Sequence, residues 1–294
     1  MAAAGRPQNS DFDAPHARES SRAGRSGGQA AVTSESAMDV VAERKHAISL
    51  EGRVSAEEWR TRVDLAACYR LVAHYGWTHL IYNHISAKIP GTPNHFLINP
   101  LGLWYEEITA SSLVKIDLDG NHVGESPYDV IKAGFVIHSA VHAARPEVMC
   151  VLHTHSIAGM AVAAMKEGLL PLSMGAMRFF GRIGYHDFEG VADDLGERAR
   201  IVRALGPHMA LIMRNHGLLA CGRTIGEAFI TMYSLERACE TQLKTMAATN
   251  AVVIPPREVC ENTARQIAAI HTPECREWPA LFRLVERLDP GFRV

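Results

Sequence analysis

The chain has 294 residues, 47% of them hydrophobic and 21% charged, which is the composition of a folded globular protein. Its 30 basic and 32 acidic residues give a net charge of −2, so no overall field favours nucleic acid or an anionic membrane. No apolar run reaches the roughly 18 residues of a membrane-spanning helix, and the N-terminus lacks the apolar core of a secretory signal. We therefore expect a cytoplasmic protein with no nucleic-acid or membrane partner.

Residues 1–37 are rich in Ala, Gly, Ser and Arg and offer little to bury, so we expect a disordered N-terminal segment. A transit peptide is the alternative, but acidic residues such as Asp11 and Glu19 disfavour it. Residues 38–285 are expected to form one domain, followed by a C-terminal tail over 286–294. The six cysteines form no CxxC pair, which indicates reduced thiols.

The first half of the domain alternates helical and strand patterns. A capping box from Ser55 to Glu58 begins a helix that ends at Gly76. Apolar and polar residues then alternate over 80–89, which predicts a strand. The next expected elements are strands at 96–99 and 114–118, a helix over 131–144 that Pro146 ends, and a buried strand at 148–152.

The second half continues with expected helices at 156–166 and 190–205 and a strand at 209–213. A second capping box, Thr224 to Glu227, begins a long helix, and the chain beyond residue 255 is helical in part. Strands interrupted by single helices, without strict alternation, predict an α/β fold with a mixed sheet flanked by helices.

Fifteen histidines stand out, because histidine is the commonest metal ligand and the side-chain acid or base closest to neutral pH. His153 and His155 follow a buried strand, where residues i and i+2 point to the same face. A second apolar strand ends just before His216. Two strands that deliver imidazoles at one end suit a catalytic three-histidine metal site, and satisfied core or surface histidines are the alternative.

Other titratable residues compete for a role in the site. His138 and His142 lie one helical turn apart, a spacing that suits a metal or an ordinary packed helix face. His186 and Glu189 lie in a polar run between elements. His138, His186 and Glu189 are the candidates for proton transfer, and the sequence does not choose among them.

With these residues in place, the chain resembles the class II aldolase/adducin family over about Ala56 to Ala247. The resemblance depends on landmarks in a fixed order. They are Tyr82-Asn-His-Ile-Ser86, Ile98-Asn-Pro-Leu-Gly102 with Tyr105-Glu-Glu-Ile-Thr109, Arg145-Pro-Glu-Val-Met-Cys-Val-Leu-His-Thr-His155, and Asn215-His-Gly217.

The resemblance implies a three-layer α/β/α fold with a mostly antiparallel central sheet, and a homotetramer with active sites at subunit interfaces. It also implies one divalent metal per subunit on His153, His155 and His216, usually zinc, with manganese or iron as alternatives. In the family's aldolases this Lewis acid stabilises an enediolate, and decarboxylating members stabilise a carbanion in the same way.

The chain differs from the sugar-phosphate aldolases of the family in the residues that bind the phosphate and in the catalytic acid/base. Their Ser-Ser-Glu run corresponds to Lys132, Ala133 and Gly134, so the catalytic glutamate is absent, and Leu101 replaces a phosphate-binding threonine. Asn83, Ser86 and Gly102 remain as candidate substrate-binding residues. Lys132 is the fourth, because it can pair with a carboxylate; a solvated helix-end lysine is the alternative.

A dianionic phosphate without these donors would be poorly satisfied. We therefore expect a metal-dependent carbon–carbon lyase, a decarboxylase or aldolase, that acts on a hydroxy- or oxo-carboxylate small molecule. A non-catalytic interaction module like adducin, and an iron-dependent oxygenase on the same three histidines, are the alternatives.

Overall fold

The computed structural model describes residues 49–190 and 196–294, without the side chains of Pro93, Lys132 and Ala133. The expected disordered segment over residues 1–37 lies outside this range. In the part of the chain that is described, no helix is long and apolar enough to cross a membrane.

One sheet contains the strands of the described residues, in the order β3-β2-β1-β4-β7-β6-β5. Every neighbouring pair is antiparallel except β5 and β6, which are parallel. The strands are β1 (His84–Ile89), β2 (Thr92–Ile98), β3 (Val114–Asp117), β4 (Cys150–Thr154), β5 (Gly184–His186), β6 (Ala210–Met213) and β7 (Gly217–Gly222). The predicted mixed, mostly antiparallel sheet is confirmed.

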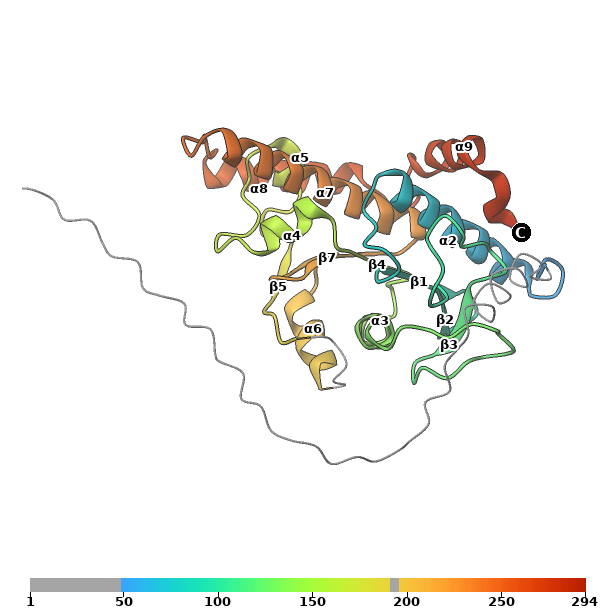
Figure 1. Cartoon of the computed structure of the whole chain (residues 1–294). Helices are drawn as coiled ribbons and strands as arrows, with labels where there is room; N and C mark the ends of the chain where they lie inside the picture. The colour runs from blue at the N-terminus through green and yellow to red at the C-terminus, as the bar shows by residue number, and fades with distance from the viewer. Residues whose placement is uncertain (1–48, 191–195) are drawn as a thin grey trace, which may run out of the picture. The chain divides into compact units, whose positions relative to one another are not determined.

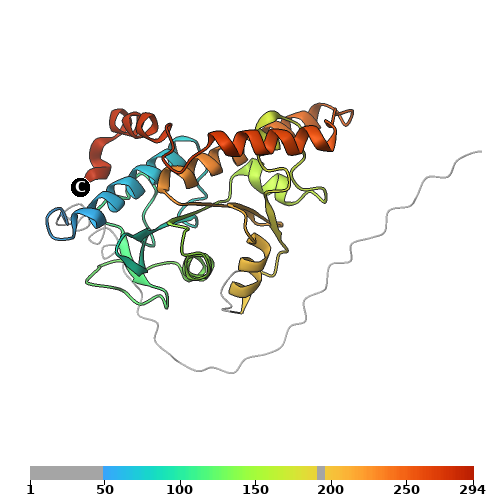
Figure 2. The same cartoon turned by 180° about the vertical axis from the view of Figure 1, so that it is seen from behind.

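Helices cover both faces of this sheet, which gives the three layers that the resemblance implied (Figures 1 and 2). On one face lie α3 (Lys132–Ala144) and α6 (Glu197–Leu205), and on the other α2 (Ala56–His74) and α7 (Ile225–Ala248). The α2 and α7 layer also includes α4 (Ile157–Ala163), α5 (Met174–Met177), α8 (Arg257–Ile270), α9 (Trp278–Leu288) and the 3₁₀ helix η1 (Pro290–Arg293).

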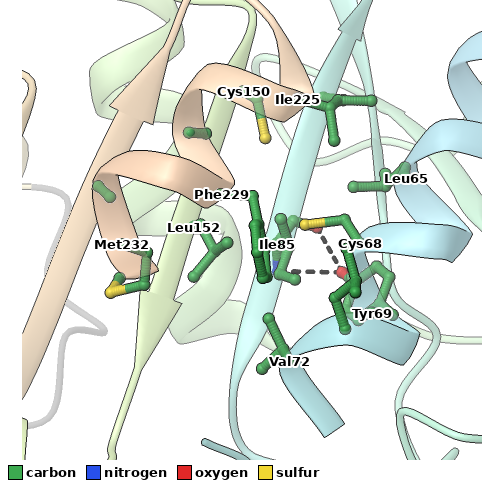
Figure 3. Packing of buried hydrophobic residues seen from close by; sticks show 14 of the residues in the cluster. Leu65, Cys68, Tyr69, Val72, Ile85, Cys150, Leu152, Ile225, Phe229 and Met232 are labelled. Carbon is green, nitrogen blue, oxygen red and sulfur yellow. Dashed lines mark hydrogen bonds between the residues drawn. The ribbon is translucent and has the colours of Figure 1, made fainter. Parts of the chain in front are cut away.

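Side-chain alternation along the central strands supplies a core to each layer. Ile85 and Leu152 pack with Phe229 and the buried face of α2 (Figure 3). Their strand neighbours point the other way, so Val151 joins the smaller core beneath α3 and α6. Because β1 and β4 are paired, a residue on the α3 side of one strand lies beside a residue on the α3 side of the other.

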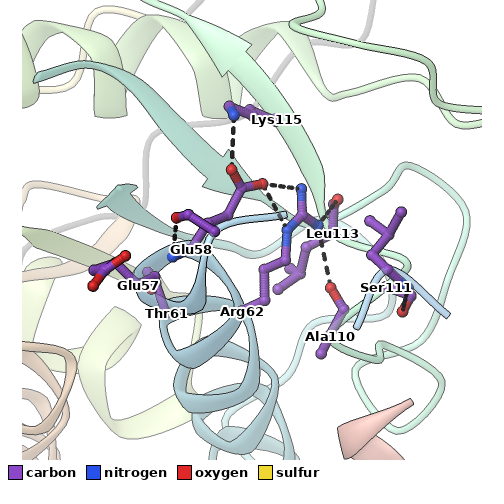
Figure 4. A network of polar contacts seen from close by, with 10 residues as sticks. Glu57, Glu58, Thr61, Arg62, Ala110, Ser111, Leu113 and Lys115 are labelled. Atoms are coloured by element: carbon purple, nitrogen blue, oxygen red, sulfur yellow. Dashed lines mark hydrogen bonds and ion pairs between the residues drawn. The ribbon is translucent and has the colours of Figure 1, made fainter. Parts of the chain in front are cut away.

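Both predicted capping boxes are confirmed. The Ser55 hydroxyl accepts from the Glu58 amide at 3.1 Å, and the Thr224 hydroxyl accepts from the Glu227 amide at 3.0 Å. The Glu58 side chain also pairs with Arg62 at 2.9 Å and with Lys115 at 2.8 Å, which ties α2 to β3 (Figure 4).

Several predicted boundaries need correction. The strand expected over 80–89 begins only at His84, because Leu80 has a left-handed φ of 49° and the Tyr82 amide closes a turn onto His79. The helix expected from residue 190 begins at Glu197, and the strands β5 and β7 were not predicted.

The C-terminal residues are part of the folded unit. The boundary expected at residue 285 falls inside α9, and the unit extends to Val294. Phe292 is fully buried, and its carbonyl accepts a hydrogen bond from the Ala110 amide at 2.9 Å. Residues 286–294 are therefore not a separate tail.

Candidate metal centre

His153, His155 and His216 lie together at one end of the adjacent strands β4 and β7. His153 is near the end of β4, His155 follows that strand, and His216 lies in the turn before β7. Their ring centroids are 4.6 to 4.8 Å apart, and the candidate ligand nitrogens all lie within 4.8 Å of one another. The structure thus brings together the three histidines that the sequence singled out, and their binding of a metal stays a prediction.

The turn that places His216 depends on two unusual backbone positions. Asn215 has a left-handed φ of 56°, a conformation that asparagine tolerates better than most residues. At Gly217 a Cβ would lie 2.3 Å from the carbonyl oxygen of Thr154. Only glycine lets β7 start this close to β4, so Gly217 sets the separation between His216 and the histidines on β4.

Hydrogen bonds hold the outer nitrogens of the two β4 histidines and leave the inner ones facing each other. His153 Nδ1 donates to the Leu218 carbonyl at 2.9 Å, and His155 Nδ1 lies 3.1 Å from His79 Nδ1. The two Nε2 atoms are 2.8 Å apart. Two imidazole lone pairs at this distance repel unless a proton or a cation lies between them, so the donor set fits a metal ion.

Burial keeps this cluster neutral. Loss of hydration lowers the pKa of His153 far below its usual value, and mutual repulsion with His216 and His155 adds to the effect. The pKa of His155 falls to about 4 for the same reasons, and that of His216 is lowered as well. Neutral imidazole is the form that binds metals, so the cluster is in a binding-competent state at pH 7.

Glu236 on α7 supports this end of β4 from the opposite layer. Its carboxylate accepts from the Thr154 hydroxyl at 2.8 Å and from the Ser156 hydroxyl, the residues on either side of His155. Glu236 is fully buried, and burial raises its pKa to about 7. Glu236 was not among the predicted site residues, although a glutamate on the apolar face of a helix is a signal that the sequence contains.

The structure places Ser86 and His138 in the interior. Both are almost completely buried, and the Ser86 hydroxyl lies 2.6 Å from His138 Nδ1 and 2.7 Å from His142 Nε2. The Ser86 hydroxyl thus contacts two imidazoles, and its contact with substrate stays a prediction. Ser86 lies between His138 and His142 and contacts both rings.

His84 fills the space beside Gly134, the position at which the resemblance implied the loss of a glutamate. A Cβ at Gly134 would lie 2.9 Å from ring atoms of His84, so the ring occupies the position that a side chain at residue 134 would take. The register of β1 and β4 places His84 opposite His153, and their ring centroids are 5.1 Å apart. The sequence analysis gave His84 no role, because its neighbours come from a strand and a helix that are distant in the chain.

The other two proton-transfer candidates are His186 and Glu189. His186 is buried and paired with Glu197 at 3.0 Å, and the charges of both residues influence the pKa of His216. Glu189 is exposed and forms an ion pair with Arg200, whose Nε lies 2.8 Å from the carboxylate.

The remaining candidates are substrate-binding residues. Asn83 is fully buried, its Oδ1 accepts from the His79 amide, and its Nδ2 has no partner among the described residues. Gly102 lies in the exposed turn after β2 with a φ of 93°. Lys132 is the first residue of α3, and its side chain is outside the described part of the structure.

Comparison with known proteins shows the family. The model of the class II aldolase and adducin N-terminal domain matches residues 63–243. The chain belongs to the class II aldolase/adducin family. It is 47% identical over 249 residues to a Pseudomonas aeruginosa protein named "Putative aldolase class 2 protein", and this match covers 83% of the chain and 96% of the relative.

Mouse alpha-adducin is 47% identical over 202 residues, which are 66% of this chain but only 27% of that protein. Among solved structures, an aldolase II superfamily protein from Pseudomonas syringae superposes with a TM-score of 0.80 at 48% identity, covering 84% of this chain and 100% of that one. The L-fuculose 1-phosphate aldolase of Glaciozyma antarctica superposes with a TM-score of 0.73 at 28% identity, covering 84% and 95%. The chain is thus a class II aldolase family member with a three-histidine cluster suited to a divalent metal.

Proposed function

We propose that this protein is a divalent-metal-dependent carbon–carbon lyase, a decarboxylase or aldolase, that acts on a hydroxy- or oxo-carboxylate. The observation that carries the proposal is the cluster of His153, His155 and His216, whose inner nitrogens face one another in the neutral form. A zinc ion held there supplies a Lewis acid that stabilises negative charge on a substrate oxygen. His153 and His155 are fixed for this role by their bonds to the Leu218 carbonyl and His79.

The surroundings favour a carboxylate over a sugar phosphate. Gly134 and the half-exposed Leu101 supply no donor where the family's sugar-phosphate aldolases have polar side chains, and the Ser86 hydroxyl is engaged with imidazoles. The unpartnered Nδ2 of Asn83 is a donor that a single carboxylate oxygen can satisfy. A dianionic phosphate requires several more donors of this kind.

We further propose that a second copy of the chain covers the site in a homotetramer. Large apolar side chains are exposed around the histidines: Tyr82 contacts His79, Ile157 follows Ser156, and Phe188 contacts His216. These side chains are 53%, 80% and 56% exposed, and a subunit interface at this rim would bury them. Light scattering on the purified protein measures the assembly.

Elemental analysis of protein purified without a metal-affinity tag tests the catalytic proposal. We expect about one equivalent of zinc per chain, or uptake of one on addition, which His153→Ala abolishes and the exposed-site control His122→Ala preserves. Hydroxy- and oxo-acids are then assayed for released carbon dioxide or aldehyde. Failure to carry or take up Zn, Mn or Fe would overturn the proposal.

A non-catalytic interaction module is the second candidate, and the 47% identity to alpha-adducin favours it. It predicts a folded oligomer that binds no metal and releases no product. Bound iron with substrate-dependent oxygen consumption would instead indicate an oxygenase on the same three histidines.

A further inference from the structure

A continuous chain of buried polar groups leads away from the metal centre beneath α3. His84 Nδ1 lies 2.8 Å from His138 Nε2, His138 Nδ1 lies 2.6 Å from the Ser86 hydroxyl, and that hydroxyl lies 2.7 Å from His142 Nε2. All four residues are at most 3% exposed. His138 contacts His84 with one ring nitrogen and Ser86 with the other, so the three contacts form one uninterrupted line.

The two ends of this line lie in different places. At one end the His84 ring is 5.1 Å from the His153 ring, beside the metal centre. At the other end His142, together with Lys88, Pro146 and Met149, lines a surface cavity of about 240 Å³. His142 Nδ1, the ring nitrogen at this end, is itself buried and makes no hydrogen bond to a described side chain. The line therefore runs from the side of the metal centre to a residue in the wall of a separate cavity.

We propose that His84, His138, Ser86 and His142 form a proton relay that supplies and removes protons at the metal centre. The inference rests on the proposed lyase function, since both aldol cleavage and decarboxylation require proton transfer at the substrate. It also gives His84 the proton-transfer task in place of the side chain that Gly134 lacks.

The transfer is balanced at every atom. His84 Nε2 accepts a proton from the substrate, and the Nδ1 proton of His84 passes to His138 Nε2. The Nδ1 proton of His138 passes to Ser86 Oγ as the hydroxyl proton moves to His142 Nε2, and the buried Nδ1 proton of His142 exchanges with water of the adjacent cavity. One proton enters and one leaves, and each ring remains neutral, which suits a site where burial disfavours imidazolium. The reverse sequence delivers a proton to a carbanion.

This mechanism restricts the tautomers of the three rings. When the line donates away from the metal centre, His84, His138 and His142 all carry their proton on Nδ1; when it donates toward the centre, all carry it on Nε2. A purely structural cluster has no such requirement, because His138 and His142 can both donate to Ser86. Mixed tautomers therefore exclude a relay, and a concerted change of all three rings from one tautomer to the other distinguishes a relay from a static hydrogen-bonded cluster.

Long-range ¹H–¹⁵N spectra of histidine-labelled protein, recorded with and without Zn²⁺, test the proposal. We expect the three rings to share one tautomer in each state, or to shift between tautomers together. In Ser86→Ala we expect the tautomer of His142 to become independent of the tautomer of His84. Ser139→Ala is the control, because it removes a buried hydroxyl on α3 that accepts a hydrogen bond from Arg198. In this variant the tautomers of His142 and His84 should still change together.

A mixed set of tautomers in the native protein would overturn the relay, and this measurement needs no variant to fold. A His142 tautomer that is the same in native protein and Ser86→Ala would overturn it as well. Both readouts are independent of turnover. Absence of metal and product would reject the lyase function, whereas mixed tautomers in a metal-loaded, active protein would reject the relay alone.

Discussion

Replacement of Glu236 by glutamine should make the protein more stable at alkaline pH. Glu236 is fully buried on α7, and burial raises its pKa to about 7 from 4.5, against the opposing effect of its bonds to Ser156 and Thr154. A carboxyl group whose pKa is higher in the folded state stabilises that state when protonated. This contribution is fully present below pH 4.5 and is lost as the pH rises through about 7.

The size of the effect follows from the pKa. At 1.36 kcal/mol for each tenfold change in acidity, a rise from 4.5 to about 7 corresponds to roughly 3 kcal/mol of stability lost between these pH values. Glutamine does not ionise and still offers one acceptor and one donor to the two hydroxyls. The free energy of unfolding of Glu236→Gln, relative to the native protein, should therefore increase by up to about 3 kcal/mol from pH 4.5 to pH 8.

Urea unfolding of both metal-free proteins at several pH values measures this difference, in which all other titrating groups cancel. Glu258→Gln, which replaces an exposed carboxylate on α8, is the surface control. A difference between Glu236→Gln and native protein that stays constant, or that decreases with pH, would refute the assignment of a protonated carboxyl at this position.

Three further predictions concern packing and charge. Gly134→Ala should lower the free energy of unfolding by roughly 1–3 kcal/mol through contact with His84, and in a His84→Ala background the same change should be neutral or stabilising. Equal losses in both backgrounds, measured by chemical denaturation, would contradict the contact. Arg62→Met leaves Glu58 without its buried guanidinium and should cost about 3–5 kcal/mol, whereas Arg60→Met, in an exposed pair, should cost less than about 1 kcal/mol. Gly217→Ala forces β7 away from Thr154 and should reduce zinc uptake in a folded protein; full uptake would show that the spacing is not critical.

Local patterns predicted the parts of this fold that depend on local physics. Both capping boxes and the buried strand that carries His153 could be inferred from spacing alone. The second predicted strand, β6, does not pair with it, because β7 lies between β4 and β6. The strand β7 escaped prediction because it is buried along its whole length and so has no alternation of polar residues.

The surroundings of the histidines could not be predicted, because they depend on tertiary packing. His84 meets His138 only because α3 lies across β1, and Glu236 reaches Thr154 only because α7 crosses the end of β4. Nothing in the spacing of these residues along the chain indicates either contact. The sequence singled out His153, His155 and His216, whereas the contacts among His84, His138 and His142 could be found only in the folded structure.

The six cysteines give the protein a built-in set of unfolding reporters. All are buried and unpaired, and burial raises the pKa of Cys68, Cys150, Cys221 and Cys239. Since only an exposed thiolate reacts quickly with alkylating reagents, each of these thiols is labelled at the rate at which its element opens. They lie on α2, β4, β7 and α7, so mass spectrometry of timed labelling would rank the opening of the helical layer against that of the sheet without any engineered probe.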